Sequence, residues 1–257
     1  MSKKYKDRTC VYCANCPSST ADHVVAREFF PPSLRNGLPK VPACQVCQTK
    51  KSELEGYLTA VLPFGSNHEA AKELLTTKVA RRLDRNLKLR RQLRDGQENV
   101  WVQEKSGLVL PSMSLPFDGE KFVDLCEYIV RGLVWHEWAV VVPHDYAVGV
   151  LTVSDQGLAI FSKHCLSQSA HLRKSVSLAN GAFEYTCNCN NEDAALSAWH
   201  IRFYGILNMG GPDGKGGLMR VQACAMTGLK AEIEKIMDGF SQLEKRQKTC
   251  GQGIWTP

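Results

Sequence analysis

The sequence predicts a mixed α+β protein in which a small cysteine-rich unit precedes a larger accessory domain. Two Cys-x-x-Cys pairs enclose a stretch with hairpin signals. Several later segments repeat apolar residues at helical spacing, and others have the β-branched and alternating character of strands. A turn at Gly65-Ser66-Asn67 separates the two parts, so we expect domains at residues 1–66 and 67–257.

The N-terminal unit is expected to be a hairpin followed by a helix. Val24-Val25 favours a short strand, and Asn36-Gly37 is a tight-turn signal. These signals predict a hairpin over residues 21–43. Apolar residues then fall on one helical face from residue 43 to residue 62, and Pro63 ends that helix.

The accessory domain is expected to alternate helices with strands. Further helices are predicted at residues 69–94, 120–140 and 228–246, and strands at residues 100–102, 108–110, 148–160, 183–185, 199–209 and 218–224. A glycine-rich stretch at residues 210–217 is predicted to be a hairpin loop.

Composition narrows the classes of function. The chain has 257 residues and a net charge of +6, which suits an anionic partner. No apolar run approaches the roughly 20 residues of a membrane span, and the N-terminus lacks the apolar core of a signal peptide. We therefore expect a cytoplasmic protein without a membrane partner. In a reducing compartment its eleven cysteines indicate metal ligands and free thiols rather than disulfides.

Two cysteine pairs predict a structural zinc site. Cys44 and Cys47 have the spacing of one half of a tetrahedral site, and so do Cys10 and Cys13. Four thiolates make a closed site that holds Zn²⁺ for structure rather than for catalysis. Cys16 follows at the same three-residue step, so the spacing alone leaves open which two of the first three cysteines are ligands.

Asp22 and His23, between the two pairs, are the candidates for chemistry. Neighbouring side chains of a strand point to opposite faces, so the two residues would have different tasks. One can bind a divalent cation while the other deprotonates a water molecule. Hydrolysis of a phosphodiester needs both functions.

A strongly basic helix is the candidate for nucleic-acid contact. Between residues 78 and 94 the chain has eight Lys or Arg residues and one acidic residue, Asp84. An excess of one charge on one element favours a phosphate-rich partner, although a solvated helix face is the alternative. The residues proposed to contact phosphates are Arg81, Arg82, Arg85 and Lys88.

These motifs together resemble the HNH endonucleases of the four-cysteine type. The resemblance is carried by the first cysteine pair, by Asp22-His23-Val24, and by Val41-Pro42-Ala43 directly before the second pair. It implies a ββα-metal finger, and the place of Asp22-His23 favours Cys10 and Cys13 as the first pair of zinc ligands. Looser similarities after residue 129 resemble a poorly characterised bacterial branch with a C-terminal accessory domain.

The resemblance also implies roles for four residues. His23 would be the general base, and Asp22 a ligand of a catalytic Mg²⁺ or Mn²⁺. Gln48 stands where the family usually has Asn or His as the second ligand, on a longer side chain. Lys51 matches the lysine that follows and is expected near the nucleic acid.

The sequence therefore predicts a metal-dependent endonuclease acting on DNA, with RNA as the other substrate left open. The alternative is a zinc-stabilised nucleic-acid-binding protein without catalysis, which needs the thiolates and the basic helix but neither Asp22 nor His23. A zinc deaminase would need His-x-Glu, and Val25 stands in the place of the Glu. The sequence does not decide the oligomeric state, and a homodimer is compatible with it.

Overall fold

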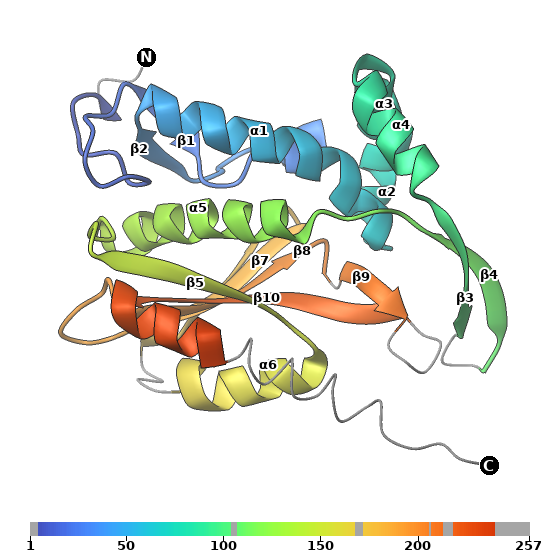
Figure 1. Cartoon of the computed structure of the whole chain (residues 1–257). Helices are drawn as coiled ribbons and strands as arrows, with labels where there is room; N and C mark the ends of the chain where they lie inside the picture. The colour runs from blue at the N-terminus through green and yellow to red at the C-terminus, as the bar shows by residue number, and fades with distance from the viewer. Residues whose placement is uncertain (1–4, 104–106, 168–171, 206, 213–217, 240–257) are drawn as a thin grey trace, which may run out of the picture.

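The computed structural model describes residues 5–103, 107–167, 172–205, 207–212 and 218–239, and it confirms the mixed α+β class. Its elements form layers (Figure 1). The N-terminal unit lies on helix α5 (Gly119–Trp138), and α5 covers one face of a central sheet. Helix α6 (Asp155–Phe161) and a helix over residues 230–239 lie on the other side of that sheet.

The N-terminal unit has the predicted hairpin and helix. Strands β1 (Thr20–His23) and β2 (Lys40–Ala43) pair antiparallel, with Thr20 opposite Ala43 and His23 opposite Lys40. The helix α1 (Gln45–Val61) follows directly. The loop between the strands contains two short 3₁₀ turns, at Arg27–Phe29 and Pro32–Leu34, and a third, at Leu62–Gly65, follows α1.

The single helix predicted over residues 69–94 is wrong, because the chain bends at Asn86. Helix α2 (Glu69–Leu74) leads through a π-helical segment (Leu75–Val79) into α3 (Ala80–Arg85), and α4 (Leu87–Asp95) begins anew. Asn86 has φ −114° and ψ 75°, and its side-chain oxygen accepts the N–H of Leu89 at 3.0 Å. Asparagine is a favoured N-cap residue, so a second helix starts at Asn86. The regular spacing of apolar residues continues across this break, and the sequence therefore looked like one helix.

The central sheet is antiparallel and runs in the order β5-β10-β8-β7-β6, with β9 paired to β10. Its strands are β5 (Tyr146–Val153), β6 (Lys174–Leu178), β7 (Phe183–Cys189), β8 (Ser197–Phe203), β9 (Leu207–Pro212) and β10 (Leu218–Leu229). The predicted strands at residues 183–185 and 218–224 are confirmed within longer ones. Strand β6 lacks a sequence signal strong enough to have been predicted.

Two predicted strands were too long. Residues 155–160 form α6, because Ser154 caps a helix there through the N–H of Gly157. Residues 199–209 divide into β8 and β9 at a turn in which Tyr204 and Gly205 have φ of 52° and 75°. The last helix begins at residue 230, because residues 228–229 still belong to β10, and its predicted continuation beyond residue 239 lies outside the described residues. Of the loop predicted at residues 210–217, residues 210–212 belong to β9 instead, and residues 213–217 lie outside the described residues.

One hydrophobic core joins the predicted domains. It includes buried residues of the N-terminal unit together with residues of α5 and the sheet, so the boundary predicted at residue 66 runs through a continuous core. The rings of Tyr12 and Tyr128 meet edge to face at 5.2 Å between centroids. A Cβ on Gly132 of α5 would lie 3.1 Å from the Val24 methyl carbons, so glycine permits close packing there.

A separate hairpin extends from this body. Strands β3 (Glu98–Gln103) and β4 (Val109–Ser114) pair with each other in a two-stranded sheet, which confirms the strands predicted at residues 100–102 and 108–110. The hairpin follows α4 and precedes α5 at one side of the molecule (Figure 1). Within the described part of the chain, every helix is too short or too polar to cross a bilayer.

Candidate metal centre and adjoining polar site

The four predicted cysteines lie together. The Sγ atoms of Cys10, Cys13, Cys44 and Cys47 are all within 4.8 Å of one another, and Cys13 Sγ lies 4.0 Å from Cys44 Sγ. Four sulfur atoms bound to zinc at about 2.3 Å occupy the corners of a tetrahedron with edges of about 3.8 Å. The spacing therefore fits a four-coordinate metal such as zinc, and the part of the chain that is described contains no second cluster of this kind.

Local backbone structure presents these sulfur atoms. The first pair sits in a tight knuckle, in which the Ala14 N–H binds the Cys10 carbonyl and Ala14 has φ 54°. The second pair comes from the start of α1, where Cys44 is the N-cap residue and Cys47 lies in the first turn. The spacing had left Cys16 as an alternative ligand. Its thiol is exposed and outside the cluster, and its N–H points to Cys13 Sγ at 3.5 Å.

The knuckle also prepares one thiol for a metal. Burial raises the pKa of Cys13, but the N–H groups of Cys16 and Asn15 more than offset this and lower it to about 6. Burial raises the pKa of the deeper Cys10 thiol. Since only the thiolate binds zinc, Cys13 offers a ligand that is ionised at neutral pH.

Next to the metal centre, a buried lysine joins three groups of the hairpin and helix. Lys51 on α1 is 1% exposed. Its ammonium donates to the His23 carbonyl at 2.8 Å, forms an ion pair with Asp22 Oδ2 at 3.0 Å, and binds Glu55 one helical turn further on. The Tyr12 hydroxyl donates to the same Asp22 oxygen at 2.7 Å. This arrangement will be called the Lys51 network, comprising Tyr12, Asp22, His23, Lys51 and Glu55.

The Lys51 network corrects one prediction. Lys51 was expected near the nucleic acid, but its charged end is enclosed and its three hydrogens have partners. It therefore cannot reach a phosphate from this position. An ammonium can be buried only when it is paired and hydrogen-bonded, and two carboxylates and a carbonyl supply that pairing here.

His23 is directed differently from Asp22. The two residues follow one another on β1, so their side chains point to opposite faces. His23 is half-buried. Burial and the neighbouring positive charge of Lys40, its cross-strand partner, lower the pKa of His23 to about 4. Its imidazole is therefore neutral at physiological pH, the state that a general base requires.

Gln48 is not brought to Asp22 by a direct contact. Its side-chain oxygen accepts a hydrogen bond from Thr20 Oγ1 at 3.0 Å. Asp22 is instead held by Lys51 and Tyr12. The sequence analysis identified neither Tyr12 nor Glu55 as a partner in this site. For Glu55 a signal existed, since it stands four residues after Lys51 in a helix.

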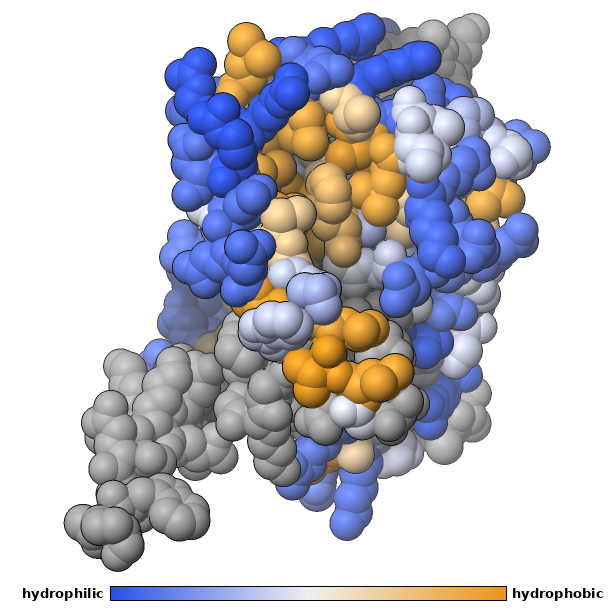
Figure 2. All heavy atoms as spheres, turned by 90° about the vertical axis from the view of Figure 1, so that its right-hand side faces the viewer, coloured by the Kyte–Doolittle hydropathy of each residue, from blue (hydrophilic) through white to orange (hydrophobic). Residues whose placement is uncertain are grey.

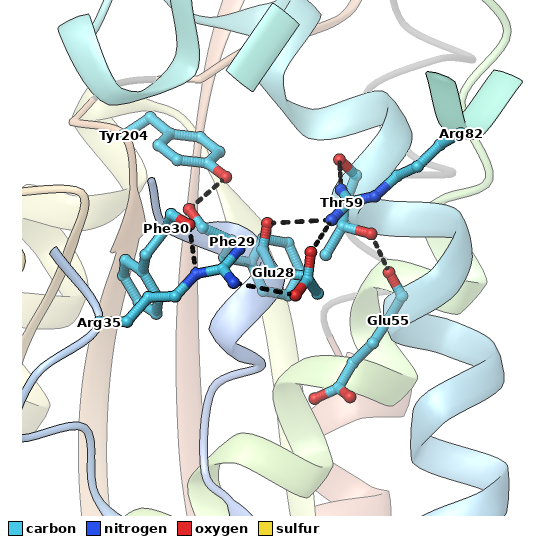
Figure 3. Close-up of polar contacts among 8 residues, drawn as sticks. All are labelled: Glu28, Phe29, Phe30, Arg35, Glu55, Thr59, Arg82 and Tyr204. Carbon is cyan, nitrogen blue, oxygen red and sulfur yellow. Dashed lines mark hydrogen bonds and ion pairs between the residues drawn. The ribbon is translucent and has the colours of Figure 1, made fainter. Parts of the chain in front are cut away.

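The predicted basic surface divides into free and engaged side chains. Arg81, Arg85 and Lys88 are exposed on α3 and α4. Arg82 is engaged: its guanidinium donates to the Thr59 carbonyl of α1 at 2.9 Å and pairs with Glu28 Oε2 at 2.5 Å (Figure 3). Its predicted role as a phosphate contact is therefore corrected to that of a link between α3 and the N-terminal unit.

Glu28 joins this link to the loop between β1 and β2. Its other oxygen pairs with Arg35 at 3.2 Å, and Arg35 Nε donates to the Phe30 carbonyl at 2.9 Å (Figure 3). The hydroxyl of Tyr204, which follows β8, donates to the Phe29 carbonyl at 2.8 Å (Figure 3). The hairpin loop is thus fixed to both α3 and the central sheet.

Comparisons with known proteins add no relative to this picture: no family model, curated protein or solved structure matches the chain.

Proposed function

We propose that the protein is a metal-dependent endonuclease whose reaction takes place at β1, beside the metal centre. The observation that carries this proposal is the pairing of a neutral, half-buried imidazole with an oriented carboxylate. His23 has a pKa lowered to about 4, and Asp22 is fixed by two hydrogen-bonding partners. Both stand on a hairpin that the four-cysteine cluster ties to α1. The motif resemblance to HNH endonucleases points to the same reaction.

In this proposal His23 accepts a proton from the attacking water. Lys51 and Tyr12 both bind Asp22 through Oδ2, which leaves Oδ1 as the oxygen available to a catalytic cation. Mg²⁺ or Mn²⁺ would supply positive charge at the scissile phosphate and needs few protein ligands, because water and phosphate oxygens complete its shell. Lys51 then acts as a positioning residue that holds both the Asp22 carboxylate and the His23 backbone.

Replacing His23 by alanine tests the reaction. If His23 is the base, cleavage of a plasmid with Mg²⁺ or Mn²⁺ is expected to fall about 10²- to 10⁴-fold. Zinc content, thermal stability and plasmid binding are expected to stay as in the wild type. His144→Ala, at an exposed loop histidine, is the matched control and should cut normally. Equal cleavage by His23→Ala and wild type would contradict the nuclease proposal.

The low pKa of His23 predicts an unusual pH dependence. A base that is protonated only below about pH 4 stays active through pH 5–6, where an ordinary histidine with a pKa near 6.5 loses activity. The cleavage rate, measured from pH 4.5 to 8 at a fixed metal concentration, should therefore lack an acidic limb centred near 6.5. A rate that halves near pH 6.5 would show that the base is a different group or that His23 is solvated in the active protein.

A second candidate function is a zinc-stabilised nucleic-acid-binding protein without catalysis. One specific observation favours it: Asp22 already has a permanent cation in Lys51, so it can be satisfied without a divalent ion. This candidate predicts nucleic-acid binding with no metal-dependent cleavage. It also predicts that His23→Ala changes neither property, so the same experiment separates the two proposals.

In both candidate functions, the exposed basic residues of α3 and α4 bind the nucleic acid. A triple variant that combines Arg81→Gln, Arg85→Gln and Lys88→Gln should bind nucleic acid more weakly. The loss of affinity should follow the number of phosphates that these residues contact, both for DNA, the partner we propose first, and for RNA. The slope of log affinity against log salt should decrease by about 3, since each lost contact removes about one unit. Lys163, Lys230 and Lys235, all exposed and distant in sequence, provide a control triple with the same change of charge.

A further inference from the structure

Of the three cysteines in the first group, Cys16 is the one outside the four-sulfur cluster. Its thiol is exposed, and it stands three residues after Cys13. Cys-x-x-Cys is the spacing of many metal sites, but it is also the spacing of dithiols that form and break disulfides. The chain has this spacing from Cys10 to Cys13 and again from Cys13 to Cys16, and the metal centre accounts only for the first.

The backbone holds Cys16 against the knuckle. The Cys10 N–H donates to the Cys16 carbonyl at 2.9 Å, and Thr9 and Pro17 form an antiparallel bridge. These contacts close the knuckle into a loop. The Cys16 N–H points to Cys13 Sγ at 3.5 Å, and hydrogen bonding to the Cys13 side chain raises the pKa of the Cys16 thiol. Cys16 is therefore fixed beside one particular ligand of the metal centre.

Cys13 is the most exposed of the four ligands. The other three, Cys10, Cys44 and Cys47, are 0%, 6% and 9% exposed, whereas Cys13 is half-buried. The knuckle lies at the end of the molecule away from the β3–β4 hairpin (Figure 1), so the hydrophobic side chains gathered on the hairpin side do not cover it (Figure 2). A small solute can therefore reach Cys13 and, beside it, the exposed Cys16.

These properties match those of a redox-sensing pair. A metal-bound cysteine is a thiolate, and the oxidation of a cysteine follows its thiolate character and its exposure. Sensor cysteines also often have a second, resolving cysteine beside them. Cys13 has the place of the sensor, and Cys16 has that of the resolving residue.

We propose that Cys13 and Cys16 are an oxidation site, at which hydroperoxides produce a reversible disulfide that removes one ligand from the metal centre. The proposal depends on the cluster holding zinc. It goes beyond the proposed function and holds whether or not the protein cleaves nucleic acid.

The chemistry balances with hydrogen peroxide as the oxidant. The Cys13 sulfur attacks one peroxide oxygen, the O–O bond breaks, and hydroxide leaves and takes up a proton to become water. The Cys16 sulfur then attacks the sulfur of the resulting Cys13 sulfenic acid. An S–S bond forms, the S–O bond breaks, and the hydroxyl group leaves as water with the Cys16 proton. The two sulfur atoms together lose two electrons, and one peroxide is reduced to two water molecules.

The disulfide should weaken the metal centre in a reversible way. Three thiolates hold zinc much less well than four, so the oxidised protein is expected to lose its zinc. A dithiol reductant attacks the disulfide and restores both thiols, after which the site can be filled again. Without Cys16, the sulfenic acid lacks its resolving neighbour and is oxidised further to sulfinic acid, which dithiols do not reduce.

The test follows zinc and disulfides in the full-length, zinc-loaded protein. Graded hydrogen peroxide should release one zinc per chain from the wild type, measured with a metal-sensitive dye. Mass spectrometry of the alkylated, unreduced protein should locate the new bond between Cys13 and Cys16. Dithiothreitol with added zinc should then restore both the zinc content and the melting temperature.

Cys16→Ser separates this reaction from a general oxidation of thiols. Under reducing conditions the variant should bind zinc and melt like the wild type, because Cys16 is exposed and outside the cluster. After peroxide and then dithiothreitol it should regain about fivefold less zinc than the wild type, since its Cys13 becomes sulfinic acid. Cys165→Ser, at a half-buried cysteine outside the metal centre, is the matched control and should behave like the wild type.

Several results would overturn the proposal. One is a different bond in the oxidised wild type, such as Cys10 to Cys13 or Cys44 to Cys47. Another is a Cys16→Ser protein that recovers its zinc as fully as the wild type. A wild type that binds no zinc, or that keeps its zinc after Cys13 and Cys16 are joined, would overturn it as well.

Discussion

Cys44→Ala is expected to unfold the N-terminal unit and, with it, the shared core. Three remaining thiolates hold zinc much less well than four, and binding of a structural zinc contributes on the order of 10 kcal/mol to the folding of small fingers. One hydrophobic cluster contains residues of the β1–β2 hairpin, α1 and α5, so the loss of structure should spread beyond residue 66. A loss of about 5 kcal/mol would lower the melting temperature by about 10–20 °C.

The measurement is a thermal melt by circular dichroism, with bound zinc determined on the same samples. Cys16→Ala is the matched control, because Cys16 is exposed next to the knuckle but outside the cluster. It should retain one zinc per chain and the wild-type melting temperature. A Cys44→Ala protein that melts like the wild type would show that the four thiols are ordinary buried cysteines. A strong chelator should lower the melting temperature of the wild type, as Cys44→Ala does.

Lys51→Met is the second change with a large expected effect. Methionine fills a similar volume, but it removes the one cation between Asp22 and Glu55, whose side chains are 12% and 14% exposed. Removing one partner of a buried ion pair leaves uncompensated charge and typically costs about 3–5 kcal/mol. Denaturant unfolding at pH 7 should show a loss of this size. If the nuclease proposal holds, cleavage should fall as well, because Lys51 binds the His23 carbonyl and orients Asp22.

The loss should depend on pH in a definite direction. In the wild type, burial raises the pKa of Glu55 and Lys51 partly lowers it again, so the variant should have a higher Glu55 pKa still. A carboxyl whose folded pKa lies above its unfolded value favours the folded state more as pH falls. The deficit of Lys51→Met relative to wild type should therefore be largest above the raised pKa of Glu55 and should narrow as the pH falls through it.

Two further variants isolate the cause. Lys50→Met removes the neighbouring, exposed lysine and should change stability by less than about 0.5 kcal/mol. Asp22→Asn and Glu55→Gln added to Lys51→Met remove the opposing charges, and this triple variant should recover most of the lost stability. Equal stability of Lys50→Met and Lys51→Met would contradict the structural role assigned to the Lys51 network.

Local patterns made part of this molecule predictable. The two cysteine pairs, the turn at Asn36-Gly37 and the helical face after Ala43 predict the hairpin, α1 and the four-sulfur cluster. Each of these depends on residues close together in the chain or on a metal-ligand spacing that has one common use. The basic charge of α3 and α4 is also a local property, and Arg81, Arg85 and Lys88 are indeed exposed.

Other features depended on competition between signals of similar strength. Residues 69–94 keep an apolar period throughout, yet the Asn86 cap breaks the helix, because capping and period each contribute about 1 kcal/mol and neither decides alone. At Ser154 the same competition turned a predicted strand into α6. At such positions the packing of the surrounding residues decides which conformation has the lower free energy.

By itself the sequence determined the class of fold, the thiolates of the cluster and the place of Asp22 and His23 on the hairpin. Only the tertiary structure decided what surrounds them. It buried Lys51 between Asp22 and Glu55, tied Arg82 to Glu28, and merged the two predicted domains into one core. The physical reason is that a charge has no fixed role in a sequence. A charged side chain can bind a metal, hold two elements together or remain free to contact a partner. Which of these it does depends on residues far away in the chain and on whether water can still reach it.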